Sequence, residues 1–167
     1  LEDRKAKLDA ILRAGRRMEV LSEAVYRIRD TKRAIDVVLE RVRDQKDSTS
    51  KALVKAGKDL KKKLEKVEFM LVSPQKREGI FRDRNVSRYL FEAMRILSSS
   101  WDRPTASEIQ KLERAEKKLE EALAKFNKVY AEDVKAFKEM VRKANFTLFP
   151  EKEPLDLNWQ PKKDKEK

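Results

Sequence analysis

Apolar residues recur every three or four positions along the first quarter of the chain, with charged residues between them. This spacing is typical of a helix with one apolar face. Because no proline interrupts the pattern, we predict one long helix, or two in near-continuous line, over residues 3–45. The residues expected on its apolar face are Leu8, Ile11, Leu12, Met18, Leu21, Val25, Ile28, Ile35, Val38, Leu39 and Val42.

A second helix is predicted over residues 49–72, after a polar turn. Asp47 or Ser48 is its expected N-cap, because short polar side chains accept hydrogen bonds from the free N–H groups of a helix start. Pro74 follows the helix, and proline ends helices. The apolar positions come close to a heptad seam and are Leu53, Ala56, Leu60, Leu64, Val67 and Leu71.

Residues 73–84 show no period, which predicts a loop, and Ile80 and Phe81 within it are expected to close one end of the core. Asn85 is the expected N-cap of a short third helix over residues 86–100. The apolar face of that helix is expected to hold Val86, Leu90, Ala93, Ile96 and Leu97.

A fourth helix is predicted over residues 105–145, where Thr105 and Glu108 have the spacing of a capping box. Its apolar stripe contains three aromatic residues that we assign to the core, namely Phe126, Tyr130 and Phe137. Residues 149–167 contain three prolines and no period, so we expect an irregular tail. Phe149 and Trp159 of this tail are expected to lie along the bundle.

Four amphipathic helices joined by short loops predict an all-α fold, an up-down-up-down four-helix bundle over residues 1–148 with long first and last helices. The shorter second and third helices, placed in series, are expected to pack beside the excess length of their partners. Gly15 and Gly57 fall inside helices, where glycine costs about 1 kcal/mol relative to alanine. Such a glycine either permits the close approach of two helices or occupies a surface position where its presence is incidental.

The composition excludes several kinds of chemistry. The chain of 167 residues contains no cysteine and no histidine, so disulfides, cysteine–zinc sites, thiol nucleophiles and histidine-based triads are ruled out. The longest purely apolar run, residues 69–72, is far shorter than the roughly 20 residues of a membrane span. No membrane span is therefore expected.

The net charge of +12 is spread thinly along the chain. Many charges can form pairs of opposite sign four residues apart, which favours a solvated helix surface over a phosphate-binding one. These pairs are Asp9–Arg13, Asp59–Lys63, Glu113–Lys117, Glu121–Lys125 and Glu139–Lys143. Six arginines of the first helix support the opposite interpretation, a nucleic-acid or anionic surface, and these are Arg13, Arg16, Arg17, Arg27, Arg29 and Arg33.

Two pairs of adjacent carboxylates, at residues 120–121 and 132–133, have the residue type of a catalytic dyad. Neighbouring residues on a helix do not face one another, so a solvated surface is the better interpretation. Trp101, beside a turn, is the aromatic residue best placed for an exposed contact, although packing at the end of the core is favoured. No catalytic, cofactor-binding or metal-ligating residue is identified, and no cofactor is expected.

Three segments follow one another along the chain: the helical segment Asp59–Glu68, the serine-rich turn Ser98–Thr105, and the segment Ala131–Phe137 near the end of the last predicted helix. This arrangement resembles the C-terminal helical region of large secreted bacterial proteins whose N-terminal part carries BNR or sortilin-type β-propeller repeats. Such proteins are often labelled glycosyl hydrolases. The resemblance transfers no active residue to this chain.

The resemblance implies a bacterial extracytoplasmic fragment, periplasmic or secreted, whose partner is the propeller of the same parent chain. A start at Leu1 without an initiator methionine agrees with a piece of a longer protein. We therefore expect a non-catalytic helical module with a structural or protein-interaction role. The alternative is a basic module that binds nucleic acid or an anionic surface, and the third hypothesis is an enzyme that uses carboxylates, Lys, Tyr or Ser.

Overall fold

The computed structural model describes residues 2–43, 45, 47–73 and 85–144 of the chain, and this part contains helices and turns but no strand. The predicted loop with Ile80 and Phe81 and the tail with Phe149 and Trp159 lie outside the described residues. The helical elements are α1 (Glu2–Val42), α2 (Ser48–Leu71), α3 (Val86–Leu97), α4 (Ala106–Val129), the π-helical turn η1 (Tyr130–Val134) and α5 (Lys135–Lys143). Among the described helices, none has the length and apolar character needed to cross a bilayer.

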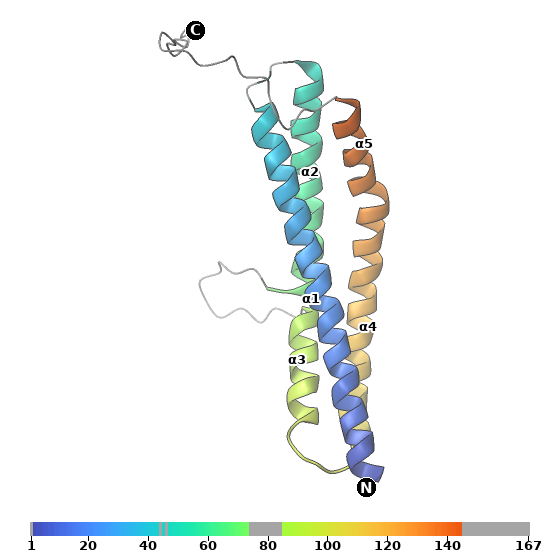
Figure 1. The fold of residues 1–167 in the computed structure, drawn as a ribbon. Helices are drawn as coiled ribbons and strands as arrows, with labels where there is room; N and C mark the ends of the chain where they lie inside the picture. The colour runs from blue at the N-terminus through green and yellow to red at the C-terminus, as the bar shows by residue number, and fades with distance from the viewer. Residues whose placement is uncertain (1, 44, 46, 74–84, 145–167) are drawn as a thin grey trace, which may run out of the picture.

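The helices form an elongated bundle in which α1 runs the full length (Figure 1). Helices α2 and α3 lie end to end along α1, and both run antiparallel to it. Helices α4, η1 and α5 then form one continuous rod that runs parallel to α1. Helix α2 packs on α1, α4 and α5, whereas α3 packs on α1 and α4. The predicted all-α bundle with long first and last helices is confirmed, and the two shorter helices lie in series as expected. Because α3 continues in the direction of α2, the order is up, down, down, up, and each level of the described part contains three helices.

Side-chain caps begin three of the helices as the sequence predicts. The Asp47 carboxylate accepts a hydrogen bond from the Ser50 amide at 3.0 Å, and the Asn85 side chain accepts one from the Arg88 amide at 3.2 Å. At α4 the Thr105 amide donates to the Glu108 carboxylate at 2.7 Å, while the Glu108 amide donates to the Thr105 hydroxyl. These bonds fix where each helix enters the bundle.

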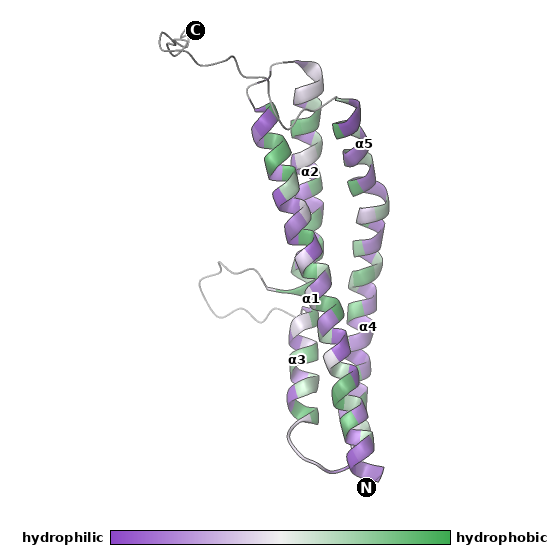
Figure 2. Ribbon diagram, in the orientation of Figure 1, coloured by the Kyte–Doolittle hydropathy of each residue, from purple (hydrophilic) through white to green (hydrophobic). Residues whose placement is uncertain are grey.

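The apolar core extends along the bundle, and Figure 2 shows hydrophobic and hydrophilic residues alternating along its helices. Near its N-terminus, α1 departs from the prediction. Leu8 and Leu12 are 50% and 49% exposed, whereas Ala10 and Ala14 are buried. Placing the two leucines in the core was therefore wrong. At this level α1 presents small alanine side chains to a cluster with Ala93, Leu97 and Leu112 of α3 and α4.

The fourth predicted helix contains a π-helical turn that the periodicity does not reveal. Tyr130 opens this turn, its ring stacks on that of Phe126 with 4.3 Å between centroids, and its hydroxyl lies 2.9 Å from the Thr31 hydroxyl of α1. Phe126 and Phe137 are buried as expected, and Tyr130 is half-buried. A π-helical turn accommodates an additional residue in the helix, and such turns often mark functional positions.

The two helical glycines have different surroundings. A Cβ atom at Gly57 of α2 would lie 2.8 Å from Leu39 Cδ2 and 3.2 Å from Ile35 Cγ2 of α1. A Cβ atom at Gly15 would meet only Met94 Cε, at 4.0 Å. Gly57 therefore permits a close approach of α1 and α2, and Gly15 does not serve this purpose.

Alanine substitutions at the two glycines test this difference. We expect Gly15→Ala to raise the free energy of unfolding by about 0.5–1 kcal/mol, because alanine is the better helix former. Gly57→Ala should lack this gain because Leu39 and Ile35 must shift, and Gly57→Val should lower the free energy by about 1–3 kcal/mol. Urea unfolding followed by circular dichroism measures all three. An equal gain from both alanine variants would contradict the close packing at Gly57.

Candidate functional site

A groove runs between α1 and the α4–η1–α5 rod, on the side of the bundle where no further described helix packs. Two hollows lie in it. The first is lined by Glu19, Val20, Glu23, Ala24, Arg27, Leu123, Phe126 and Asn127. The second, which we call the α1–α5 groove, is lined by Thr31, Ala34, Ile35, Val38, Leu60, Val134, Phe137, Lys138, Val141 and Arg142.

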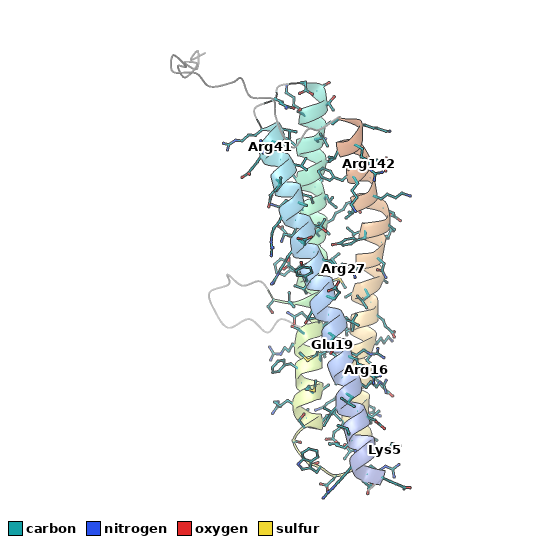
Figure 3. The ribbon with its side chains drawn as sticks, viewed as in Figure 1. Lys5, Arg16, Glu19, Arg27, Arg41 and Arg142 are labelled. Atoms are coloured by element: carbon teal, nitrogen blue, oxygen red, sulfur yellow. The ribbon has the colours of Figure 1, made fainter. Side chains whose placement is uncertain are left out.

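The three-helix cross-section explains why the α1–α5 groove exists. Helix α5 packs on α2, and Leu60 of α2 forms part of the groove floor between α1 and α5. The hydrogen bond between Tyr130 and Thr31 ties η1 to α1 near the junction of the two hollows. Figure 3 labels Arg27, from the first hollow, and Arg142, from the second.

The α1–α5 groove combines an apolar wall with basic side chains. Its volume is about 290 Å³, and its exposed wall is apolar. Lys138 and Arg142 are the charged residues that line it, whereas the first hollow also includes two glutamates. The α1–α5 groove is therefore suited to apolar side chains that are flanked by carboxylates.

Buried charges elsewhere hold the helices together. The Glu116 carboxylate of α4 accepts hydrogen bonds from Arg13 Nε and Arg17 Nε of α1, each at 2.8 Å, and pairs with the Arg13 terminal nitrogen. Burial raises the pKa of Glu116, but the hydrogen bonds from Arg13 and Arg17 outweigh this effect and hold the pKa below its ordinary value. This carboxylate therefore stays ionised and joins α1 to α4.

The fully buried Lys7 forms a second connection between α1 and α4. Its ammonium donates to the Glu108 carboxylate at 2.9 Å, and Glu108 is also part of the capping box of α4. The backbone hydrogen bond from Thr105 and the side-chain hydrogen bond from Lys7 lower the pKa of Glu108. The Glu108 carboxylate thus accepts hydrogen bonds both from a free amide at the start of α4 and from the buried ammonium of Lys7.

A third connection joins α1 to α2. Glu68 accepts from Arg29 Nε at 2.8 Å and from Lys32 Nζ at 3.0 Å. Burial raises the pKa of Glu68, and the two cationic donors lower it further than burial raises it. Because each of these carboxylates has its cationic partners, the arrangement is suited to holding helices rather than to proton transfer.

The ion pairs differ from those expected within single helices. Lys63 pairs with Asp133 of η1, Glu121 with Lys118, and Glu139 with Arg142. Like Arg13, Lys63 reaches a partner on a neighbouring helix, and none of the five predicted pairs forms among the described residues. Arg13 and Lys63 instead reach carboxylates on neighbouring helices, whereas Glu121 and Glu139 pair with cations three residues away in their own helices. The charges of Lys125 and Asp59 still act on the pKa of Glu121 and of Lys63, without ion-pair contact.

The structure does not bring the residues considered from the sequence together into one site. The adjacent carboxylates at 120–121 and 132–133 face solvent or cations, and no group of three metal-ligating side chains occurs in the described residues. Trp101 is 74% exposed, so the prediction that it packs at the end of the core is wrong. Four of the eight arginines in α1 form ion pairs with described residues, and these are Arg13, Arg17, Arg27 and Arg29.

No protein-family model, curated protein or solved structure matches the chain. The α1–α5 groove is not apparent from the sequence. Its walls come from residues that the periodicity assigned to a closed core, including Val38, Phe137 and Val141.

Glu116→Gln tests the connection between α1 and α4. At neutral pH we expect a loss of about 1–2 kcal/mol in the free energy of unfolding, because the charge-assisted hydrogen bonds from Arg13 and Arg17 are weakened and both arginines are partly exposed. The native pKa of Glu116 is lowered, so its contribution is complete above the unfolded value of about 4.3 and is lost as pH falls through the native value.

Urea unfolding at neutral pH and at steps below about pH 4.3 measures this contribution. The difference between the two proteins should shrink as the pH falls. Glu120→Gln, at an exposed position of α4, is the matched control and should change little. A difference that stays constant with pH would show that the charge of Glu116 is not what stabilises the bundle.

Proposed function

We propose that this chain is a non-catalytic helical module with a protein-interaction role, and that the α1–α5 groove receives an apolar segment of a partner protein. The observation that carries the proposal is an apolar hollow bordered by Lys138 and Arg142. Grooves between helices commonly bind amphipathic segments through a few apolar anchors. The partner segment would place acidic residues beside the two cations.

The ion pairs between helices support this role because they hold the walls of the groove in place. Lys61 of α2 pairs with Asp36 of α1, and Lys63 of α2 pairs with Asp133 of η1. The Tyr130 hydroxyl joins η1 to Thr31 of α1, which lines the groove. A groove that is formed before binding costs less conformational entropy when the partner docks. The module would thus serve as a rigid docking surface.

The alternative function, binding of nucleic acid or an anionic surface, is less well supported. Affinity for a polyanion depends on cations that are free to displace its counterions. Four of the eight arginines of α1 already pair with carboxylates of this chain, and two of those carboxylates, Glu68 and Glu116, are only slightly exposed. The net charge of +12 therefore overstates the cationic surface of the described helices.

We extend the proposal to the context that the resemblance implies, a C-terminal module of a larger secreted propeller-containing protein. Its support is the order of three segments in the sequence, and the comparisons add none. The gene sequence upstream of Leu1 tests it. Propeller blades and a signal peptide in frame would support this context, and a start codon directly before Leu1 without an export signal would contradict it.

A synthetic amphipathic peptide tests the groove itself. The peptide has about four helical turns, with leucine or phenylalanine on one face and glutamates beside them. Ala34→Glu places a carboxylate on the groove wall and should weaken binding at least about tenfold, equal to about 1.4 kcal/mol. Fluorescence anisotropy of the labelled peptide measures the dissociation constant.

Val37→Glu is the matched control, because Val37 is an exposed residue of α1 that does not line the groove. Circular dichroism verifies that both variants fold. Equal binding by Ala34→Glu and Val37→Glu would exclude the groove as the binding site.

A further inference from the structure

The segment that follows α5 has a composition that matches the α1–α5 groove. Residues 146–159 combine apolar side chains with acidic ones and carry a net charge of −2. The apolar residues are Phe146, Leu148, Phe149, Leu155, Leu157 and Trp159, and the charged residues are Glu151, Lys152, Glu153 and Asp156. This is the composition that the groove favours, namely apolar anchors with carboxylates between them.

The charges of the two hollows favour the α1–α5 groove as the site for this segment. Lys138 and Arg142 line it and would attract the three carboxylates of residues 146–159, and Lys138 forms no ion pair with a described residue, whereas Arg142 already pairs with Glu139. The first hollow contains Glu19 and Glu23 together with Arg27, which pairs with Glu23, so its lining carries a net charge of −1 and would not attract them. At close range, opposite charges beside an apolar contact fix the register of the docked segment.

The position of the segment along the chain also favours this groove. The lining of the groove ends at Arg142, and α5 ends at Lys143 with Ala144 as its C-cap. The stretch of helix between Val134 and Arg142 is about 12 Å long. Fourteen extended residues reach about 45 Å, so residues 146–159 are long enough to turn at the end of α5 and return along the groove.

We infer that residues 146–159 of the same chain occupy the α1–α5 groove and compete with a partner segment for it. This inference rests on the proposed function, because it requires that the groove bind an apolar, acidic segment. A segment attached directly to α5 has an effective concentration in the millimolar range. Even weak contacts therefore suffice for occupancy within one chain, whereas a second copy would need a much higher affinity.

Tryptophan fluorescence tests occupancy in the full chain. Trp101→Phe removes an exposed ring and leaves Trp159 as the single tryptophan. We expect quenching of Trp159 by acrylamide to be several-fold weaker than in the urea-unfolded chain. Adding Ala34→Glu should restore strong quenching, and adding Val37→Glu should not. Strong quenching of Trp159 in the Trp101→Phe protein itself would overturn the inference.

A concentration series distinguishes the two sources of a docked segment. Protection of Trp159 that is independent of protein concentration supports docking within one chain. Protection that is lost on dilution, together with dimers in analytical ultracentrifugation, would overturn docking within one chain in favour of a second copy.

Competition separates this inference from the proposed function. In the full chain with Phe149→Ser and Trp159→Ser, the synthetic peptide should bind about tenfold more tightly than in the unsubstituted chain if the segment occupies the groove nine-tenths of the time. Equal, measurable binding by both proteins would overturn the inference and leave the proposed function standing. Failure of both proteins to bind would overturn the proposed function and the inference together.

Discussion

The length of α1 is the constraint on which the rest of the structure depends. Its 41 residues make a rod of about 60 Å, whereas α2 and α3 contain 24 and 12 residues. Neither of the shorter helices can cover α1 alone, so the two lie end to end along it. The returning rod of α4, η1 and α5 completes only three helices at each level of the described bundle. No described helix occupies the fourth side of a four-helix bundle, and the α1–α5 groove lies there.

This thin cross-section also explains the placement of the charges. At the N-terminal end of α1 the core contains small side chains, such as Ala10, Ala14 and Ala115, which bring α1 and α4 close together. The guanidinium groups of Arg13 and Arg17 then reach Glu116 on α4. In a buried ion pair, the desolvation cost of the two charges offsets much of their attraction, so the pair adds little net stability. Its larger effect is to destabilise other alignments of the helices, in which one charge would be buried without its partner. The pairs thus fix the register of a bundle whose apolar core is small.

Local sequence signals identified the features that depend on neighbouring residues. The caps at Asp47, Asn85 and Thr105 follow from side chains that bond to amides three residues away. Features that depend on distant residues were missed. Leu8 and Leu12 have the right helical spacing, but their exposure depends on how α3 and α4 meet α1. The π-helical turn at Tyr130 is stabilised by a contact with Thr31, 99 residues away, and therefore leaves no local signal.

The groove was missed for the same reason, and its residues show what periodicity can and cannot distinguish. Apolar spacing marks Val38 and Val141 as residues that avoid water, but it does not say which segment covers them. In this bundle α2 packs beneath them through Leu60, and the opposite side of the groove has no described helix over it. Any segment that covers such an apolar wall stabilises the protein by about 25 cal/mol per Å² of apolar surface removed from water. A cover from the same chain can be displaced by a partner only if the partner makes better contacts, so the identity of the cover sets the affinity of the module.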